Sequence, residues 1–416
     1  MKRAGWYPVA LLGAFVATSF VVVGVSVGTW WHDPTNVSVA FAHRPWLDGW
    51  VRWDAAWYLE IARHGYHYRG PHLQSSVAFF PMYPLLMRFL GGPLGDDALA
   101  GIVVSAISGL VVAVLFFRWC EQRLGTATAR LALAAMLTYP FAFYLFGAVY
   151  ADALFIAAAL AAFALLEADH PVLAGAAGAV ATASRPVGAA LVIGLVVRTL
   201  ELRGALPGSS FGRQGPADAD REPAGGATLT AAPSSTRIAS PTRRLGRKRL
   251  EPRDAGVLLS LAGLIGYCVM LAIRFGDPLA FESVAGAPGW QQAPGPRVWL
   301  KFAVFSRASH FPFGFSDYTI FAQALLTAVA LALVPRVIRR LGWGYGAFTA
   351  AIIVLPALST KDFAGMGRYL LAAFPCFALI GEHLRARRRE AAVYLAGSGA
   401  LLVLCTVLFS RSYYVS

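Results

Sequence analysis

One carboxylate stands in a stretch of the chain that is rich in aromatic residues. Asp54 follows Trp53 and comes four residues before Tyr58, in a long segment between two apolar runs. An ionised carboxylate there could act as a general base and take the proton of a substrate hydroxyl. Gly65 suggests that a short helix covers 54–64, and an Asp at the start of a helix could equally well be its N-cap. The residue types alone leave both interpretations open.

Four more charged side chains stand at the ends of apolar runs or inside them, where charge is costly. Asp152 opens one run and could cap a helix or hold a polar ligand. Arg185, beside Pro186, is either a salt-bridge partner or an anion ligand. Arg368 begins another run, and its fork of donors suits a phosphate, although its side chain could also simply reach lipid headgroups. Lys361, in the same turn, is a weaker candidate.

Histidine and cysteine provide no convincing metal site. His64, His67 and His72 lie close together in the sequence, but no carboxylate or Cys completes a ligand set with them. The four cysteines stand singly in or beside apolar runs, as small core residues do. We therefore expect no metal and no other cofactor.

The elements that position these side chains must lie in a membrane. Of the 416 residues, 57% are hydrophobic and only 14% are charged, whereas about 25% are charged in soluble domains. The net charge of +14 comes from short clusters of Arg and Lys between apolar runs, which is typical of cytoplasmic loops. No nucleic-acid-binding motif accompanies it, so we expect a multi-pass protein of the cell membrane and no nucleic-acid partner.

The apolar runs set the expected topology, because a span needs about 20 mostly apolar residues. The runs cover 8–29, 99–118, 131–149, 151–166, 171–197, 255–274, 317–335, 343–358, 369–381 and 391–409. Basic clusters place the N-terminus and three turns in the cytoplasm. Both ends of 171–197 then lie in the cytoplasm, so we expect two short helices broken near Arg185 and Pro186. The total is about 11 membrane helices in an all-α fold.

Three regions follow from this pattern. Residues 1–203 form an N-terminal membrane core, and its external loop 30–97 carries Asp54 on helices that lie at the membrane surface. Residues 204–253 are rich in Gly, Pro, Ser, Ala and Arg without periodicity, which predicts a disordered cytoplasmic loop. Residues 254–416 form the C-terminal membrane helices.

The residues around Asp54 resemble the PIG-V family, the mannosyltransferases that add the second mannose in GPI-anchor assembly, and their bacterial relatives. The resemblance is carried by Arg52-Trp53-Asp54, Ile61-Ala62-x-His64-Gly65-Tyr66 and Ala78-Phe79-Phe80-Pro81. Three weaker matches follow in order at 150–155, 184–188 and 367–370. Asp152 stands where the family has Glu, which puts its role in doubt. The resemblance covers most of the membrane core but not 204–253.

The resemblance implies a GT-C type fold, with many membrane helices and the active site in external loops, outside the cytoplasm. It implies a polyprenyl- or dolichyl-phosphate mannose donor and Asp54 as the base of an inverting glycosyl transfer. The leaving phosphate then needs fixed positive charge, for which Arg368, Arg185 and Lys361 are the candidates. Three aromatic residues could hold the sugar or keep the loop on the lipid, namely Trp53, Tyr58 and Tyr66.

Several alternatives and unknowns accompany this hypothesis. The acceptor could be a glycolipid or a protein, and membrane lipids surround the chain in either case. The main alternative function is a polytopic lipid or solute transporter of the cell envelope, whose polar residues would gather at the bilayer midplane, often in repeated halves. A third possibility is a non-catalytic partner in envelope assembly. The polar residues here stand mainly at the expected external boundary, which favours the enzyme.

Overall fold

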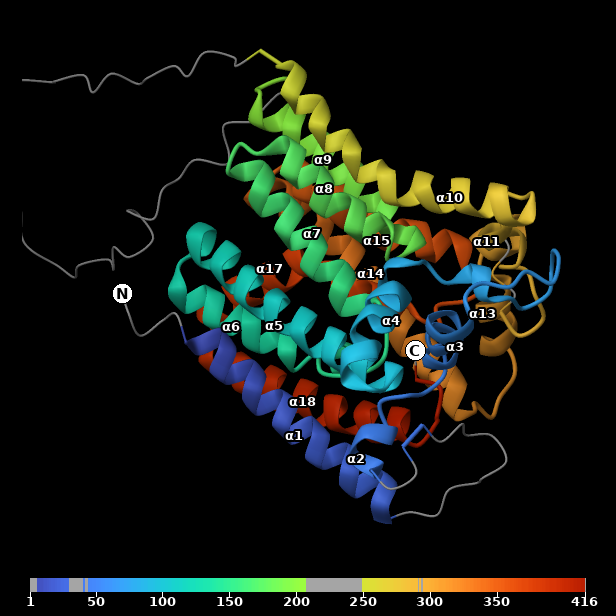
Figure 1. Cartoon of the computed structure of the whole chain (residues 1–416). Coiled ribbons are helices and arrows are strands. Elements are labelled where there is room, and N and C mark those ends of the chain that lie inside the picture. The colour runs from blue at the N-terminus through green and yellow to red at the C-terminus, as the bar shows by residue number, and fades with distance from the viewer. Residues whose placement is uncertain are drawn as a thin grey trace, which may run out of the picture.

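The computed structural model is all-helical, with no strand in the part of the chain that it describes (Figure 1). It describes residues 6–29, 40–41, 44–206, 249–290, 292 and 295–415. Within these residues, five helical stretches are long and apolar enough to cross a membrane. They are α1 (Tyr7–Thr29), α5 (Asp97–Leu124), η6 with α10 (Pro252–Leu261 and Ala262–Phe275), α14 (Phe315–Leu341) and α18 (Arg388–Ser410). The chain is therefore a multi-pass membrane protein.

The expected count of about 11 membrane helices is not confirmed, because several apolar runs form shorter or broken helices. Run 131–149 is not one helix: α6 (Thr126–Leu137) ends inside it, and the chain continues irregularly through η2 (Ala142–Leu145). Run 369–381 is likewise divided between α16 (Met366–Ala372) and α17 (Phe374–Arg385). Hydropathy predicts where the chain is buried but does not report where a buried helix ends.

The expected break inside run 171–197 is confirmed. Two helices, α8 (Pro171–Thr182) and α9 (Ala189–Leu202), are joined by a short 3-10 turn, η3 (Pro186–Gly188). Proline fixes the backbone at the start of that turn and cannot donate to a continuing helix. α8 packs closely against α7 (Asp152–Glu167). The end of α8 and the start of α7 thus meet inside the protein.

The irregular stretch between α6 and α7 is buried and held by side-chain hydrogen bonds. The Ser105 hydroxyl on α5 donates to the Ala148 carbonyl at 2.7 Å. The Tyr83 hydroxyl lies 2.8 Å from that of Ser105 and also donates to Gly101. Buried backbone needs such partners, so this stretch has a defined conformation. Its last tyrosine, Tyr150, stands just before the start of α7.

The described part of the first predicted external loop, 40–41 and 44–97, is folded onto the bundle. It contains α2 (Pro45–Asp48), α3 (Ala55–His64), η1 (Ser76–Ala78) and α4 (Met82–Leu94). The short helix before Gly65 is confirmed, and Gly65 has φ 79°. The helix does not, however, turn its apolar side to lipid: Tyr58 and Ile61 are buried, and α3 packs against α4 and α5.

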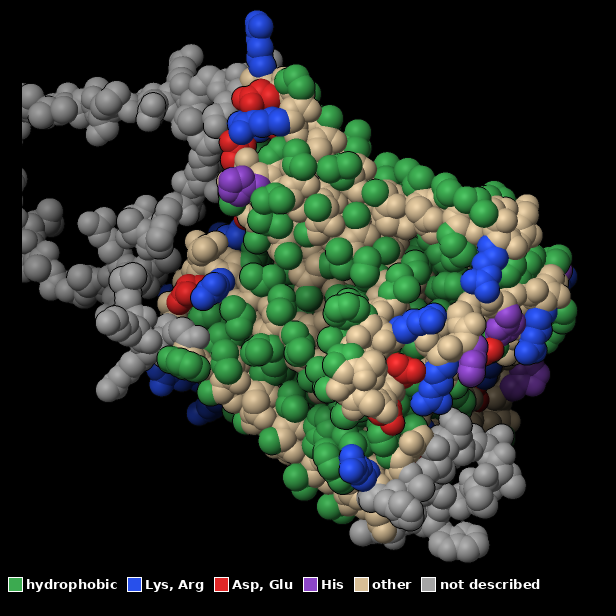
Figure 2. All heavy atoms as spheres, in the orientation of Figure 1, with side chains coloured by type: hydrophobic (Ala, Val, Ile, Leu, Met, Phe, Trp, Pro, Cys, Tyr) green, Lys and Arg blue, Asp and Glu red, His purple; other side chains and the backbone are tan. Residues whose placement is uncertain are grey.

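Three short helices, α11 (Ala280–Ser283), α12 (Pro296–Trp299) and α13 (Phe302–Ala308), follow α10; Figure 1 shows α11 and α13 at the end of the molecule that carries α3. The longer α15 (Trp343–Ser359) packs along α9 and α14 and begins at the opposite end, where Glu201 accepts from the Trp343 backbone N–H. In the space-filling view, apolar side chains cover the middle of the visible face, and charged side chains gather towards its two ends (Figure 2). This distribution suits a bilayer around the middle.

The predicted disordered loop at 204–253 lies outside the described residues from 207 to 248, and so does the start of the chain at 1–5. At the described edges of that loop, Arg203 donates to the Asp254 carboxylate at 2.5 and 2.9 Å. Arg253 and Arg203 also pair with Asp169. These ion pairs join the helix before the loop to the helix after it.

Candidate functional site

Asp54 stands at the N-terminal end of α3, but its side chain makes no capping hydrogen bond. Its Oδ2 instead accepts a hydrogen bond of 2.9 Å from Nη1 of Arg368, 314 residues further along the chain. The Asp54 side chain is 29% exposed, whereas that of Arg368 is 13% exposed. The Asp54 carboxylate is thus reachable from solvent, and it is bound by the less exposed guanidinium of Arg368.

Arg368 lies on α16 and is enclosed by two tyrosine rings. Its guanidinium carbon is 5.2 Å from the ring centroid of Tyr150 and 5.6 Å from that of Tyr144. Such cation–π contacts stabilise a cation in a place with little water. The Nε of Arg368 is buried and has no hydrogen-bond partner. One of its donors therefore remains for another acceptor.

Tyr150 connects the start of α3 to the buried stretch before α7. Its hydroxyl accepts from the Asp54 backbone N–H at 3.1 Å and donates to the Arg52 carbonyl at 3.2 Å. Arg52 is itself buried and paired with Asp48 at 2.7 Å. Tyr150 therefore fixes the backbone that leads into Asp54, which limits where the carboxylate can point.

A second ion pair lies beside the first. Arg185, in the break between α8 and α9, pairs with Asp152 at the first residue of α7, and both side chains are buried. The Arg185 guanidinium lies 4.6 Å from the ring centroid of Tyr369, the residue after Arg368. The structure thus shows Arg185 in a salt bridge with Asp152, and the roles of both residues towards a substrate stay predictions.

Tyr58 lies between the two ion pairs. It is buried, and its ring packs edge-on against those of Tyr83 and Tyr150. Burial raises the pKa of its hydroxyl above the usual range; Arg185 opposes this shift, and the carboxylates of Asp54 and Asp152 reinforce it. Tyr58 is therefore neutral and contributes a hydroxyl rather than a charge.

Three other predicted residues lie at the margin or away from this cluster. Trp53 is 42% exposed, has a φ of 54° and packs edge-on against Tyr414. Tyr66 packs against Tyr267 and donates to the Phe79 carbonyl at 2.8 Å, so it holds the loop. Lys361 is half-buried in the turn between α15 and α16.

Four residues of this region were not predicted from the sequence, namely Tyr144, Tyr150, Tyr369 and Lys301. Tyr150 stands two residues before Asp152, and Tyr369 directly follows Arg368. This proximity to predicted site residues was the only sequence feature that could have indicated them. Tyr144 belongs to an apolar run that predicts a continuous membrane helix, and Lys301 is far in sequence from every predicted site residue except Lys361 and Arg368, from which it is also separated by α14 and α15. Only the folded chain brings them here.

Among the described residues, no group of three or more His, Cys, Asp or Glu could hold a metal ion. His67 instead pairs with Glu60 at 3.0 Å.

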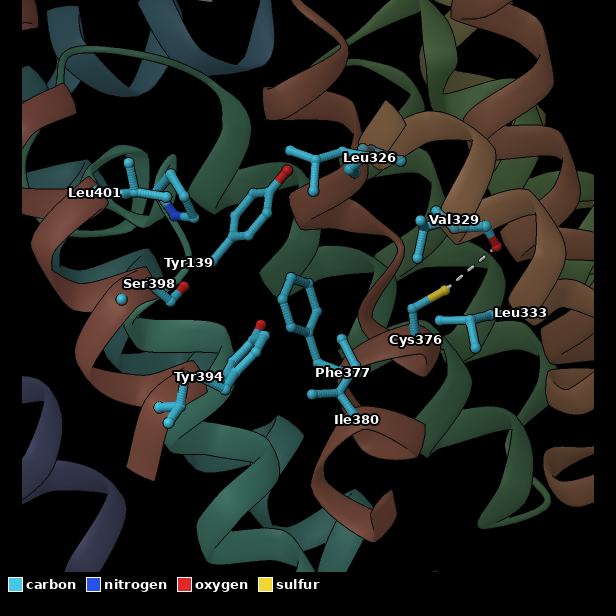
Figure 3. A pocket seen from close by; sticks show the side chains of 15 residues that line it. Tyr139, Leu326, Val329, Leu333, Cys376, Phe377, Ile380, Tyr394, Ser398 and Leu401 are labelled. Atoms are coloured by element: carbon cyan, nitrogen blue, oxygen red, sulfur yellow. Dashed lines mark hydrogen bonds between the residues drawn. The ribbon is translucent and has the colours of Figure 1, made fainter. Parts of the chain in front are cut away.

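A separate apolar cavity of about 370 Å³ lies between α14, α17 and α18. Figure 3 shows Tyr139, Phe377 and Leu401 among the side chains that line it. Leu370, two residues after Arg368, forms part of the wall. The Tyr139 hydroxyl donates to the Gly367 carbonyl at 3.2 Å. The cavity wall and the residue that binds Asp54 thus share α16.

No protein-family model matches this chain, and no curated protein sequence does. Among solved structures, the chain is similar to ArnT from Cupriavidus metallidurans bound to undecaprenyl phosphate, with TM-score 0.49 and 15% identity over 98% of this chain and 77% of that one. It is also similar to the archaeal oligosaccharyltransferase AglB from Archaeoglobus fulgidus in complex with an inhibitory peptide and a dolichol-phosphate, with TM-score 0.45 and 10% identity. That match covers 99% of this chain but only 56% of AglB.

Proposed function

We propose that this protein is an inverting glycosyltransferase that moves mannose from a polyprenyl-phosphate donor to an acceptor hydroxyl at the outer face of the membrane. The observation that carries the proposal is the Asp54–Arg368 ion pair. Oδ2 of Asp54 lies 2.9 Å from Nη1 of Arg368, and the carboxylate is partly exposed whereas the guanidinium is largely buried. A base that solvent can reach and a fixed cation beside it are the two groups that such a transfer needs.

In the proposed reaction, Asp54 takes the proton of the acceptor hydroxyl while that oxygen attacks the anomeric carbon of the donor sugar. The new glycosidic bond forms as the bond from the anomeric carbon to the phosphate oxygen breaks, through a transition state with oxocarbenium character. The bonding electrons leave with the phosphate. Because the leaving group departs as an anion, the scheme needs no general acid.

Arg368 would hold the donor phosphate. Its Nε is an unused buried donor, and a buried donor without a partner is unfavourable until an acceptor reaches it. A phosphate oxygen satisfies it, and the planar guanidinium can then bridge phosphate and Asp54. The Arg185–Asp152 pair would keep a second fixed cation close to the developing charge, with Lys361 as a weaker candidate.

The apolar chain of the donor has a candidate site in the cavity between α14, α17 and α18. Its walls are almost entirely apolar, and Leu370 links them to α16. A hydrocarbon chain that moves from lipid into this cavity exchanges one apolar surface for another, so van der Waals packing against the walls would hold it. Trp53 and Tyr58 would contact the sugar from the exposed side and the buried side.

Mannose as the sugar rests on the resemblance to the PIG-V family, as does the external location of the site. The acceptor is a glycolipid or a protein. The positive clusters at the opposite end of the molecule from α3 support a cytoplasmic location for that opposite end.

The test is transfer of labelled mannose from polyprenyl-phosphate mannose in membranes that contain wild type, Asp54→Asn or Arg368→Ala at equal protein level. Glu60→Gln is the matched control, because Glu60 is a partly exposed carboxylate on the same helix. We expect transfer by wild type and Glu60→Gln and its loss in the other two. Equal transfer by Asp54→Asn would exclude Asp54 as the base, and no transfer by wild type would favour another sugar or a transporter.

A further inference from the structure

The chain between α11 and α14 exposes an unusual number of large apolar side chains. α12 and α13 contain no buried residue at all. The exposed fraction ranges from 52% for Trp299 to 83% for Phe311 in a set of five: Trp299, Leu300, Phe302, Phe305 and Phe311. We call residues 296–314 the α12–α13 segment. Surfaces of this kind are covered by a partner or by lipid.

The position of the segment indicates lipid. It leads directly into α14, which is long and apolar enough to cross a membrane. On α14, Tyr318 is 59% exposed and Leu325 is 66% exposed. The apolar surface of the segment therefore continues the outward-facing surface of a membrane span, at the point where that span reaches the edge of the bilayer.

The charge of the segment agrees with a headgroup environment. Arg297, Lys301 and Arg307 are its charged residues, and no Asp or Glu occurs between 295 and 314. Arg307 is neutralised in part by Asp317, at 2.8 Å. Aromatic residues mixed with Arg and Lys are typical of chain that lies in the interfacial layer, where rings reach the acyl boundary and cations meet lipid phosphates.

We infer that the α12–α13 segment is a lipid-binding element that lies in the headgroup layer at the end of the molecule that carries α3. Its Trp, Leu and Phe side chains enter the acyl boundary, and Arg297 contacts lipid phosphates. This inference does not depend on the proposed glycosyl transfer.

The side chain of Lys301 connects the segment to the candidate site. Lys301, which has a φ of 53°, donates from Nζ to the carbonyls of Thr360 and Asp362 at 2.5 and 3.3 Å. The same amine lies 5.1 Å from the ring centroid of Phe363. These acceptors belong to the turn that leads into α16, and therefore to Arg368. Lipid binding by the segment thus holds the turn that positions Arg368.

Single-cysteine probes in lipid nanodiscs test the lipid contact. In a full-length chain whose four native cysteines are changed to Ala, an environment-sensitive fluorophore is attached at Phe305→Cys or, as the exposed control, at Arg69→Cys. We expect the first probe to be blue-shifted and quenched by headgroup-proximal spin-labelled lipid, and the second to be quenched only by a water-soluble quencher. Quenching of the Phe305→Cys probe from water alone would overturn the inference, and so would shielding from both quenchers, which would indicate a protein partner.

Hydrogen exchange tests the connection to the turn. We expect Phe302→Glu/Phe305→Glu and Lys301→Met each to speed exchange of the amides at 360–366, with exchange in α15 unchanged. The Lys301→Met protein should retain the lipid quenching at position 305, because only the connection is removed. Unchanged exchange in both variants would show that the segment does not hold the turn.

Discussion

Asp54 and Arg368 behave as one chemical unit in this structure. The carboxylate is bound by the guanidinium at 2.9 Å, and its backbone is bound by Tyr150. A base in this arrangement depends on its cation for orientation, and the cation depends on the carboxylate for charge balance. Residues that act as a unit show strongly non-additive effects when they are removed.

A double-mutant cycle should reveal this dependence. Asp54→Asn should lower kcat for transfer by about 10²–10⁴-fold, the usual contribution of a general base. Arg368→Met should lower it as well, and the double variant should lose little more than the worse single variant. Steady-state kinetics with a fixed lipid-linked donor measures this. Losses that multiply would mean that the two residues act independently.

The Asp152–Arg185 pair should matter for stability as well as for transfer. Both side chains are buried, so removing one partner leaves an unpaired buried group, which typically costs roughly 3–5 kcal/mol. We expect Asp152→Asn to lower the Tm in detergent. The double variant Asp152→Leu/Arg185→Met should recover most of that Tm without recovering transfer. Recovery of both would show that the pair serves the fold alone.

At the scale of elements, sequence patterns predicted those features that depend on local chemistry. The break at Pro186 follows from a missing backbone donor, and the end of α3 follows from Gly65, whose φ is positive. The irregular path of 138–151 could not be predicted, because its Phe and Tyr residues are as apolar as those of a helix. That path is fixed by Ser105 and Tyr83, which come from other elements.

The difference between local chemistry and contacts from distant elements also explains which residues of the candidate site could be predicted. Asp54, Tyr58, Asp152, Arg185 and Arg368 were all chosen from the sequence, and the fold brings them together. Their roles stay predictions. The tyrosines around Arg368 were missed because a cation–π contact joins residues whose separation in sequence carries no pattern.

The cavity between α14, α17 and α18 offers a test at the scale of elements. Gly397 lines it, and a Cβ at that position would meet no atom within 4 Å. Gly397→Leu should therefore fold normally but raise KM for a long-chain donor while leaving a short-chain donor unaffected. Gly399→Leu on the same helix is the matched control, because it is equally open but lies outside this cavity. Equal effects of both variants would exclude the cavity as the chain site.

The connection through Lys301 should depend on pH. Burial lowers the pKa of Lys301 from 10.5 to about 8, against the pull of Asp362. Between these values the unfolded chain binds more protons there than the folded chain, so the contribution of Lys301 to stability rises with pH and is lowest below about pH 8. The Tm of wild type minus that of Lys301→Met should therefore increase from pH 8 to about pH 10. A difference that falls over that range would contradict the assignment.

At the scale of the whole molecule, charge is concentrated at the two ends. One end contains α3, α16 and the α12–α13 segment, and the other contains the Arg203–Asp254 ion pair. A partly buried network of Arg123, Glu167 and Arg198 joins α5, α7 and α9. The candidate site thus lies at one end of the helical bundle, and at the other end ion pairs join the helices to one another.

This arrangement predicts that the segment between the paired ends is dispensable for the fold. Replacement of residues 210–246 by a short Gly-Ser linker should leave the Tm and transfer unchanged, because Arg203 and Asp254 remain joined. Arg203→Ala should lower the Tm in both backgrounds, since it leaves the buried Asp254 without its partner. Thermal unfolding followed by fluorescence measures both. A lower Tm after the deletion alone would assign that segment a structural role.

The hydroxyl of Tyr150 has a consequence for fidelity. Its proton is committed to the Arg52 carbonyl, and it accepts from the Asp54 backbone N–H. It therefore has no proton with which to orient a water molecule beside the Asp54 carboxylate. In the proposed transfer, water is the competing nucleophile, and its activation by Asp54 would hydrolyse the donor without glycosylating the acceptor. Because the Tyr150 proton is already donated to the Arg52 carbonyl, we expect Tyr150 to give such a water no hydrogen bond, which favours transfer over hydrolysis.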